Sequence, residues 1–229
     1  MLLLVLGKGK TGSLVAQVAR ERGHGVRVLD LAENRHASAL TAPLLAGVDV
    51  VIDFTTAEAA LENMRAVLAL GGRIVVGTTG WYPHLADMRT LAEKRGGALL
   101  YGTNFSIGVQ KLFRLTAELA NLDGYQFSIT ETHHESKLDA PSGTAITLQQ
   151  IVEAAQAKKG AGASVEVTSY RVGDAKGEHT VTATGPDDVI ELRHDAFSRR
   201  GFALGAVRAA EWLSQHSGAH DFREIFDQL

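Results

Sequence analysis

Apolar residues in the first half of the chain fall into short continuous runs, and segments with helical spacing separate these runs. A continuous run is typical of a strand buried on both faces of a parallel sheet, whereas apolar positions three and four apart indicate an amphipathic helix. Strands that alternate with helices imply right-handed crossovers and a single parallel sheet. We predict strands at residues 2–6, 26–29, 48–54, 73–76 and 98–101, and helices at residues 13–22, 57–70 and 88–94.

The pattern changes in the second half, where apolar and polar residues alternate in several segments. This alternation predicts strands with one open face in a mixed or antiparallel sheet. A strand at residues 125–132 leads into a polar cluster, residues 133–139, and the alternating strands follow at residues 165–172, 179–184 and 189–194. Helices are expected from Pro141 to about Ala157 and at residues 202–213, with a loop at residues 158–163. The chain is therefore predicted to be α/β, with a Rossmann-like parallel-sheet domain and a smaller α+β domain that has a mixed sheet.

Composition narrows the class of protein. The chain has 229 residues, of which 45% are hydrophobic and 21% are charged, with a formal net charge of −3. These values fit a globular protein with a sizeable core and exclude a disordered or fibrous class. The small net charge argues against a nucleic-acid partner, and no apolar stretch approaches the ~20 residues of a membrane span. The absence of cysteine excludes disulfides, a thiolate zinc site and a cysteine nucleophile.

The apolar start of the chain resembles an export signal only superficially. It has no basic region, and glycine and lysine residues stop it at Gly7. A run of this length is better explained as a buried strand than as a signal peptide. We therefore expect a cytoplasmic protein without a membrane partner.

A glycine-rich loop follows the first predicted strand and reads Gly7-Lys8-Gly9-Lys10-Thr11-Gly12. Glycines in a G-x-G-x-x-G pattern allow a sharp turn and let backbone N–H groups approach a pyrophosphate at a helix N-terminus. Asp30 ends the next strand, where an acid commonly binds the adenine ribose. The context favours dinucleotide binding over a tight turn without a ligand. Asp30 favours NADH, but Lys8, Lys10 and Arg35 could offset its charge, so NADH and NADPH both remain open.

Two further loops lie at the carboxyl ends of predicted strands, the edge at which open α/β sheets bind ligands. Taken alone, each could be an ordinary turn. Together with the glycine loop they favour a cofactor site. Their residues are Gly77-Thr78-Thr79-Gly80 and Gly102-Thr103-Asn104-Phe105-Ser106.

The most specific stretch is the polar cluster with its flanks, Glu131-Thr132-His133-His134-Glu135-Ser136-Lys137-Leu138-Asp139-Ala140-Pro141-Ser142-Gly143-Thr144-Ala145. This run resembles the signature of the dihydrodipicolinate reductase (4-hydroxy-tetrahydrodipicolinate reductase) family, which acts in lysine and diaminopimelate biosynthesis. Further segments match the family in order along nearly the whole chain. They are the glycine loop, Asp53-Phe54-Thr55, Gly77-Thr78-Thr79-Gly80, Asn104-Phe105-Ser106, Gly108-Val109, Gly177-Glu178-His179-Thr180 and Ser198-Arg199.

The resemblance implies a dinucleotide-binding domain of residues 1–104 and 199–229, and a substrate-binding and oligomerisation domain of residues 105–198 that assembles a homotetramer. The implied reaction is hydride transfer from NADH or NADPH to a small cyclic dicarboxylate, giving tetrahydrodipicolinate. By resemblance, His133 and Lys137 are the acid/base pair, and His134, Lys137, Gly143 and Thr144 bind the substrate. The implied cofactor contacts are Gly7 to Gly12, Gly77 to Thr79 and Gly102 to Phe105.

The chain departs from the family pattern on the cofactor side. Its glycine loop is one residue shorter than the common G-x-x-G-x-x-G form, and Gly102-Thr103 stands where Ala-Pro is commoner. The stretch between Asp30 and Asp49 is also short. These changes affect the choice of cofactor more than the chemistry.

Elementary chemistry supports the substrate site independently of the resemblance. Ser142, Gly143 and Thr144 stand where a helix begins, so backbone N–H groups and the helix dipole can hold a carboxylate. Lys137 adds a full positive charge. Hydride addition to a conjugated imine creates negative charge, and a nearby imidazole or ammonium can supply the proton, typically for a gain of ~10²–10⁴-fold.

Other interpretations of the cluster remain to be weighed. A metal site built from His133, His134 and Glu135 is disfavoured, because adjacent strand residues point to opposite faces and no H-E-x-x-H pattern is present. We therefore predict no metal. Glu131, Glu135 and Asp139 are expected to be local partners. His179 and Arg199 could face the same cleft, with Arg199 as a carboxylate binder or domain-contact residue. Solvated loop residues, another amino or keto acid dehydrogenase, and a non-catalytic NAD(P)-binding sensor are the competing hypotheses.

Overall fold

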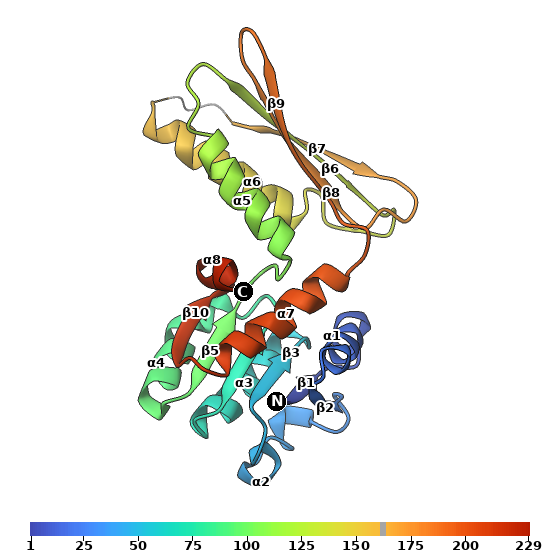
Figure 1. Cartoon of the computed structure of the whole chain (residues 1–229), viewed down its shortest axis with the longest axis vertical. Helices are drawn as coiled ribbons and strands as arrows, with labels where there is room; N and C mark the ends of the chain where they lie inside the picture. Colours follow the sequence, from blue (N-terminus) through green and yellow to red (C-terminus); the bar gives the residue numbers. More distant parts are fainter. Residues whose placement is uncertain (161–163) are drawn as a thin grey trace. The chain divides into compact units, whose positions relative to one another are not determined.

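The computed structural model describes residues 1–160 and 164–229, and contacts divide them into two compact units (Figure 1). The first unit comprises Met1–Ser106 and Arg200–Leu229, and the second comprises Ile107–Arg199. The chain therefore leaves the first unit once and returns to it for its last segment.

A parallel six-stranded sheet forms the centre of the first unit, with the strand order β10-β5-β4-β3-β1-β2. Its members are β1 (Leu2–Leu6), β2 (Gly25–Leu29), β3 (Val50–Asp53), β4 (Arg73–Val76), β5 (Ala98–Tyr101) and β10 (Gly218–Asp221). Residues 3–6 and all of β3 and β5 are buried, which explains why these strands are continuous apolar runs in the sequence. The predicted parallel α/β sheet is confirmed.

Helices cover both faces of this sheet. Helices α1 (Lys10–Glu21) and α7 (Arg200–Leu213) pack against each other, and α7 also contacts β3, β4 and β5. Helices α3 (Ala57–Ala69) and α4 (Leu85–Arg95) pack together in a separate core with Leu4, Ile74 and Leu99. The shorter helices are α2 (Ala42–Leu45), α8 (Phe222–Ile225), η1 (Arg35–Ala37), η2 (Tyr82–His84) and η3 (Phe226–Gln228).

The second unit contains a mixed sheet covered on one face by two helices. Its strand order is β7-β6-β8-β9; β7 runs parallel to β6, and the other neighbours are antiparallel. The elements are α5 (Ile107–Leu119), β6 (Gln126–His133), α6 (Gly143–Lys158), β7 (Glu166–Arg171), β8 (Glu178–Thr184) and β9 (Val189–Asp195). The core joins apolar residues of α5 and α6 to the inward residues of the strands, including Ile129 and Val181. The prediction of a mixed sheet is confirmed.

Several element limits differ from the predictions. The predicted helix 13–22 begins at Lys10, because Gly9 serves as its N-cap and the last residues of the glycine motif are already helical. The predicted strand 48–54 is shortened to Val50–Asp53, since its pairing with β1 starts at Val50 and its pairing with β1 and β4 ends at Asp53. His133 is the last residue of β6 rather than part of the following loop. Part of the loop predicted at residues 158–163, namely 161–163, lies outside the described residues.

Helix α5 and strand β10 were not predicted, and neither were the shorter helices. Helix α5 carries a readable signal, because Val109, Leu112 and Phe113 have helical spacing and are buried. Strand β10 has the sequence Gly-Ala-His-Asp and offers no apolar run. It forms at the sheet edge by parallel pairing with β5, a tertiary contact that local sequence does not report.

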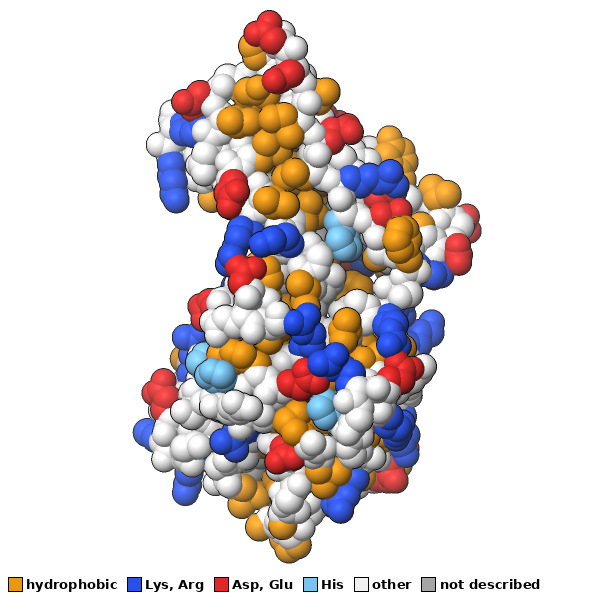
Figure 2. All heavy atoms as spheres, viewed as in Figure 1, with side chains coloured by type: hydrophobic (Ala, Val, Ile, Leu, Met, Phe, Trp, Pro, Cys, Tyr) orange, Lys and Arg blue, Asp and Glu red, His pale blue; other side chains and the backbone are white. Residues whose placement is uncertain are grey.

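No helix within the described residues is both long and apolar enough to cross a membrane. On the face shown in Figure 2, basic and acidic side chains are interspersed rather than separated into fields of one sign.

Candidate active site

The glycine loop of the first unit places a helix N-terminus directly after β1. Gly7 has a φ of +100°, and a Cβ there would lie 2.4 Å from the carbonyl oxygen of Phe54. A Cβ on Gly12 would lie 2.1 Å from the carbonyl oxygen of Gly7, so α1 approaches the strand as closely as backbones allow. Gly9 caps α1 without a side chain and has open space around it. The first-turn N–H groups of Lys10, Thr11 and Gly12 lack intrahelical acceptors, as the pyrophosphate of a dinucleotide requires.

Asp30 follows β2 and is part of a charged group that includes Lys8. The Lys8 Nζ lies 3.3 Å from the Asp30 carboxylate and 2.8 Å from that of Glu33. Asp30 Oδ1 also accepts the Glu33 N–H at 3.0 Å, which with the Lys8 contact lowers the pKa of Asp30. The ion pair between Lys8 and Asp30 supports the expectation that Lys8 offsets the charge of Asp30. Glu33, which also pairs with Lys8, was not among the residues singled out from the sequence. Lys10 and Arg35 are exposed.

Asp53, at the end of β3, is a fully buried carboxylate that ties together the loops after three strands. It accepts hydrogen bonds from the Thr55 N–H at 3.0 Å, the Thr78 hydroxyl at 2.8 Å and the Asn63 side chain at 2.7 Å. Asn63 in turn accepts from the side chain of Asn34 at 2.8 Å. Burial raises the pKa of Asp53, while these donors oppose the rise. The network holds Thr55 and Thr78, in the loops after β3 and β4, to the same carboxylate. The one signal for this role in the sequence is an acid at the end of a buried strand.

The predicted cofactor loops differ in how they expose their residues. Thr78 is buried and its hydroxyl donates a hydrogen bond to Asp53, whereas Thr79 is exposed. A Cβ on Gly77 would lie 2.2 Å from the ring of Phe54, so only glycine fits beside that ring. In the loop after β5, Thr103 is exposed and Asn104 is buried.

Phe105 anchors the loop after β5 in the first unit. Its ring lies 4.5 Å from that of Phe222 and 6.2 Å from that of Phe54, measured between centroids. A Cβ on Gly102 would approach the Cβ of Phe222 to 2.9 Å. The loop is therefore held in place by aromatic packing and by a close approach between Gly102 and Phe222.

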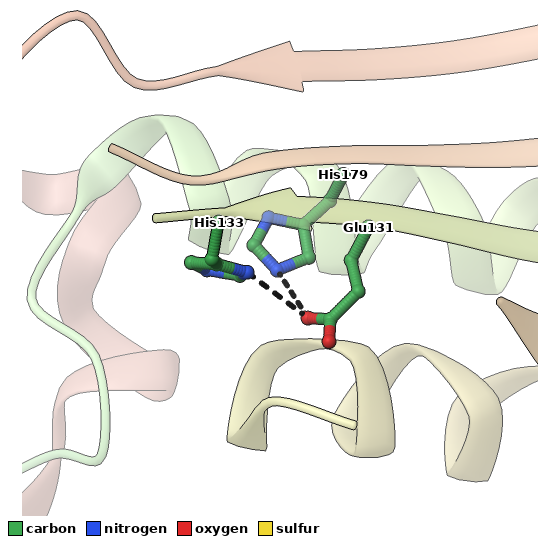
Figure 3. A group of neighbouring side chains, drawn as sticks. All are labelled: Glu131, His133 and His179. Atoms are coloured by element: carbon green, nitrogen blue, oxygen red, sulfur yellow. Dashed lines mark ion pairs between the residues drawn. The ribbon is translucent and has the colours of Figure 1, made fainter. Parts of the chain in front are cut away.

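In the second unit, β6 ends in a buried polar group made of Glu131, His133 and His179. Alternation along β6 puts Glu131 and His133 on one face, and β8 contributes His179 (Figure 3). One carboxylate oxygen of Glu131 lies 3.3 Å from His133 Nδ1 and 3.6 Å from His179 Nε2. Burial lowers the pKa of His133, and it lowers that of His179 to about 4. The structure thus joins His133 to two residues for which only a local or uncertain role was expected.

The remaining predicted substrate residues follow directly after β6. Lys137 pairs with Asp139 at 2.7 Å and keeps about a fifth of its side chain exposed. His134 lies next to Ser136, with 2.9 Å between Nδ1 and the hydroxyl. Ser142 caps α6 by accepting the Ala145 N–H at 3.3 Å, and Gly143 is exposed with open space around its Cα. Thr144 is half-buried in the first turn of α6.

The metal set considered from the sequence is not the one that the fold brings together. Glu135 is exposed, with an oxygen 3.4 Å from the Gly173 N–H, while His134 faces Ser136. Among the described residues, the donors close enough to share an ion are those of Glu131, His133 and His179, all within 4.8 Å of one another. The Glu131 carboxylate already accepts the Arg171 guanidinium at 3.2 Å. We therefore interpret the group as a buried polar cluster whose carboxylate is paired with Arg171.

Comparison with known proteins shows what this arrangement belongs to. Residues 1–105 match the family model described as dihydrodipicolinate reductase, N-terminus, and residues 108–226 match the model for the C-terminus of the same enzyme. The chain belongs to the dihydrodipicolinate reductase family. It is 36% identical to the 4-hydroxy-tetrahydrodipicolinate reductase of Christiangramia forsetii, with 100% of this chain and 99% of that protein covered. It is 38% identical to the enzyme of the same name from Natronomonas pharaonis, with 98% and 99% covered.

Solved structures agree on the fold. A dipicolinate-bound dihydrodipicolinate reductase from Paenisporosarcina sp. TG-14 superposes with a TM-score of 0.81 at 23% identity, covering 98% of this chain and 99% of that one. An amine dehydrogenase from Mycobacterium smegmatis, at 11% identity, reaches a TM-score of 0.61 over 98% of this chain and 95% of its own. As a dihydrodipicolinate reductase family member, the chain is an NAD(P)H-dependent oxidoreductase with an NAD(P)-binding N-terminal region. The predicted family, fold class, enzyme class and cofactor class are confirmed.

Proposed function

We propose that the chain reduces 4-hydroxy-tetrahydrodipicolinate to tetrahydrodipicolinate with NADH or NADPH, in lysine and diaminopimelate biosynthesis. The observation that carries the proposal is full-length similarity to enzymes of that name, together with an uninterrupted family signature at residues 131–145. A structural relative described as dipicolinate-bound supports a cyclic dicarboxylate as the ligand class.

The two units have different roles in this proposal: the first binds the cofactor and the second binds the substrate. In the first unit, the α1 N-terminus and the loops 77–79 and 102–105 hold the cofactor, which supplies a hydride when bound. The open space at Gly9 and the N–H groups of the first turn of α1 suit the pyrophosphate. Asp30 accepts hydrogen bonds from the adenine ribose of the cofactor. We assign cofactor binding to residues 1–104 and 199–229, and substrate binding and assembly into a homotetramer to residues 105–198.

In the second unit, charge and a helix N-terminus hold the substrate. The backbone of Gly143 and Thr144 at the start of α6, together with His134 and Lys137, binds the substrate carboxylates. Arg199, exposed at the end of this unit, is a further candidate for a carboxylate. Each helix-terminus contact contributes about 0.3–1 kcal/mol when exposed.

His133 and Lys137 supply the proton that must accompany the hydride. Lys137 remains partly exposed while paired with Asp139, so its ammonium can reach a bound ligand. His133 is 8% exposed, and burial lowers the pKa of its ring, so its protonated form gives up a proton readily. A proton donor of this kind typically contributes ~10²–10⁴-fold to the rate.

The test is oxidation of NADH and NADPH, followed at the nicotinamide absorbance, with the substrate produced in place by dihydrodipicolinate synthase. We expect turnover, and a fall of about two orders of magnitude or more in Lys137→Ala with nearly unchanged NADH binding. Lys159→Ala is the matched control, because Lys159 forms a similar 2.7 Å ion pair with Asp123 at the opposite end of α6. Dipicolinate should compete with the substrate.

Other outcomes distinguish the competing functions. Turnover only with a different amino or keto acid would make the chain another dehydrogenase. Dinucleotide binding without turnover on any such substrate would make it a sensor. Unchanged turnover in Lys137→Ala would remove Lys137 from the mechanism.

A further inference from the structure

Glu131 is a fully buried carboxylate that the proposed chemistry does not use, yet it touches every part of the polar group in the second unit. Its Oε1 accepts hydrogen bonds from the Ser142 N–H at 3.0 Å, the Ser169 hydroxyl at 2.8 Å and the Arg171 guanidinium at 3.2 Å. Its Oε2 faces the two histidines (Figure 3). A charge buried so deeply is costly unless it is fully paired, so its retention calls for a specific role.

We propose that Glu131 is a positioning residue: it fixes the tautomer and orientation of the His133 ring and, with its other oxygen, the N-terminus of α6. This inference rests on the proposed function, in which His133 transfers a proton and the start of α6 binds a substrate carboxylate. One side chain would then set the distance between the proton donor and the anion-binding turn.

The first part of the argument is the tautomer of His133. Glu131 Oε2 and His133 Nδ1 are both buried, lie 3.3 Å apart and have no hydrogen-bond partner among the described residues. Because an ionised carboxylate can only accept hydrogen, the ring nitrogen that faces it is favoured as the one that carries hydrogen. That nitrogen is Nδ1, which leaves Nε2 to exchange a proton with a ligand. Nε2 points toward Gly177, where a Cβ would lie 3.1 Å away. Gly177 has a φ of +136° and no side chain, so no Cβ presses on that nitrogen.

The charges around His133 come from every element packed against it. Glu131 and Asp139 raise the pKa of His133, whereas Lys137 and Arg171 lower it, and burial is the largest effect and also lowers it. His179 lies edge-on to His133 at 5.1 Å between ring centroids and is kept neutral by its own burial. Glu131 is therefore the main negative charge that stabilises a protonated His133, and removing it should lower the pKa of His133 further.

The second part of the argument is the start of α6. The Ser142 N–H donates to Glu131, and the Ser142 hydroxyl accepts from the Ala145 N–H while lying 3.2 Å from His179 Nε2. Ser142 is thereby held on both sides, and the following turn is presented in one orientation.

Arg171 extends the same control to the loop of Lys137. Besides Glu131, its guanidinium donates to the backbone oxygen of Lys137 at 3.3 Å and to that of Asp139. Removal of the Glu131 charge would leave Arg171 without its buried counter-ion. The proton donor, the anion-binding turn and the lysine loop therefore share one anchor.

The experiment compares Glu131→Gln with Glu135→Gln, the same change at an exposed acid four residues away. In Glu131→Gln we expect kcat to fall at least tenfold, and the alkaline limb of the kcat–pH profile to move to lower pH, because a proton donor with a lower pKa is lost earlier. Glu135→Gln should leave both unchanged. Wild-type values in Glu131→Gln would overturn the proposal.

A readout independent of activity is ¹⁵N NMR of the labelled histidines. The wild-type His133 ring should carry its hydrogen on Nδ1, and the Nε2–H form should gain population in Glu131→Gln. A wild-type ring protonated mainly on Nε2 would overturn the proposal even if Glu131→Gln failed to fold. A stoichiometric Zn²⁺ ion in the purified wild type that is lost in Glu131→Gln would also overturn it, by making the group a metal site.

The two proposals fail in distinguishable ways. Absence of turnover in the wild type would refute the proposed substrate, whereas the NMR measurement would still decide the tautomer of His133. Normal turnover in the wild type with an unchanged profile in Glu131→Gln would refute the positioning role alone.

Discussion

Two glycines of helix α7 offer a test of how the loop after β5 is held. A Cβ on Gly205 would lie 1.7 Å from the carbonyl oxygen of Phe105 and 2.9 Å from its carbonyl carbon. A Cβ on Gly201 would meet only the Ser106 hydroxyl oxygen, at 3.8 Å. Gly205→Ala therefore forces a backbone to move, while Gly201→Ala makes an ordinary van der Waals contact.

The magnitude follows from comparing the two variants. Both replace glycine by alanine in the same helix, so the gain in helix propensity, about 1 kcal/mol, largely cancels. Inserting a methyl group into a packed site costs typically about 1–3 kcal/mol, and a carbonyl oxygen cannot move aside by changing a rotamer. We expect Gly205→Ala to be less stable than Gly201→Ala by about 2 kcal/mol or more. For a chain of this size that corresponds to a difference of about 4–8 °C in Tm.

The assay is thermal unfolding followed by circular dichroism, with NADH affinity measured by titration. Because Phe105 belongs to a predicted cofactor loop, Gly205→Ala should also weaken NADH binding, and Gly201→Ala should not. Equal Tm values for the two variants would show that α7 does not constrain this loop, and the reasoning from backbone approach would be wrong.

Three further predictions concern other parts of the site. Thr78→Val should lower the free energy of unfolding by about 1–3 kcal/mol in urea, because the buried Asp53 loses a donor; Thr79→Val at the exposed neighbour should change it by less than about 0.5 kcal/mol. Burial lowers the pKa of His179 to about 4, so between pH 6.5 and about 4 the unfolded chain binds a proton at His179 that the folded chain does not; the free energy of unfolding should therefore decrease as the pH is lowered through this window, and His179→Gln should make that decrease less steep. Asp30→Ala should shift the ratio of kcat/KM values toward NADPH; an unchanged ratio would show that Asp30 does not touch the ribose.

The local pattern of the sequence was sufficient for most of the fold. Continuous apolar runs predicted the central strands, because every side chain of a strand that is covered on both faces is buried and therefore mostly apolar. The glycine motif predicted the strand-to-helix turn, since only glycine fits the close approaches at Gly7 and Gly12. Strand β10 was not predicted, because its sequence has no apolar run and its formation depends on pairing with β5.

The candidate site was predicted less completely. His133 and Lys137 were singled out by the resemblance of residues 131–145 to the family signature, and their roles stay predictions. The buried partners could not be assigned, since Glu131 meets His179 and Arg171 only through the pairing of β6 with β8 and β7.

The sequence by itself determined the order of the elements, the family and the residue types available for chemistry. The tertiary structure decided which of these residues share an environment. Glu33 joined Lys8, Asp53 joined Thr78 and Glu131 joined His133, each across a separation that no local pattern spans. The physical reason is that hydrophobic periodicity records which face of an element is buried, whereas the pKa and hydrogen bonding of a side chain depend on partners brought by other elements.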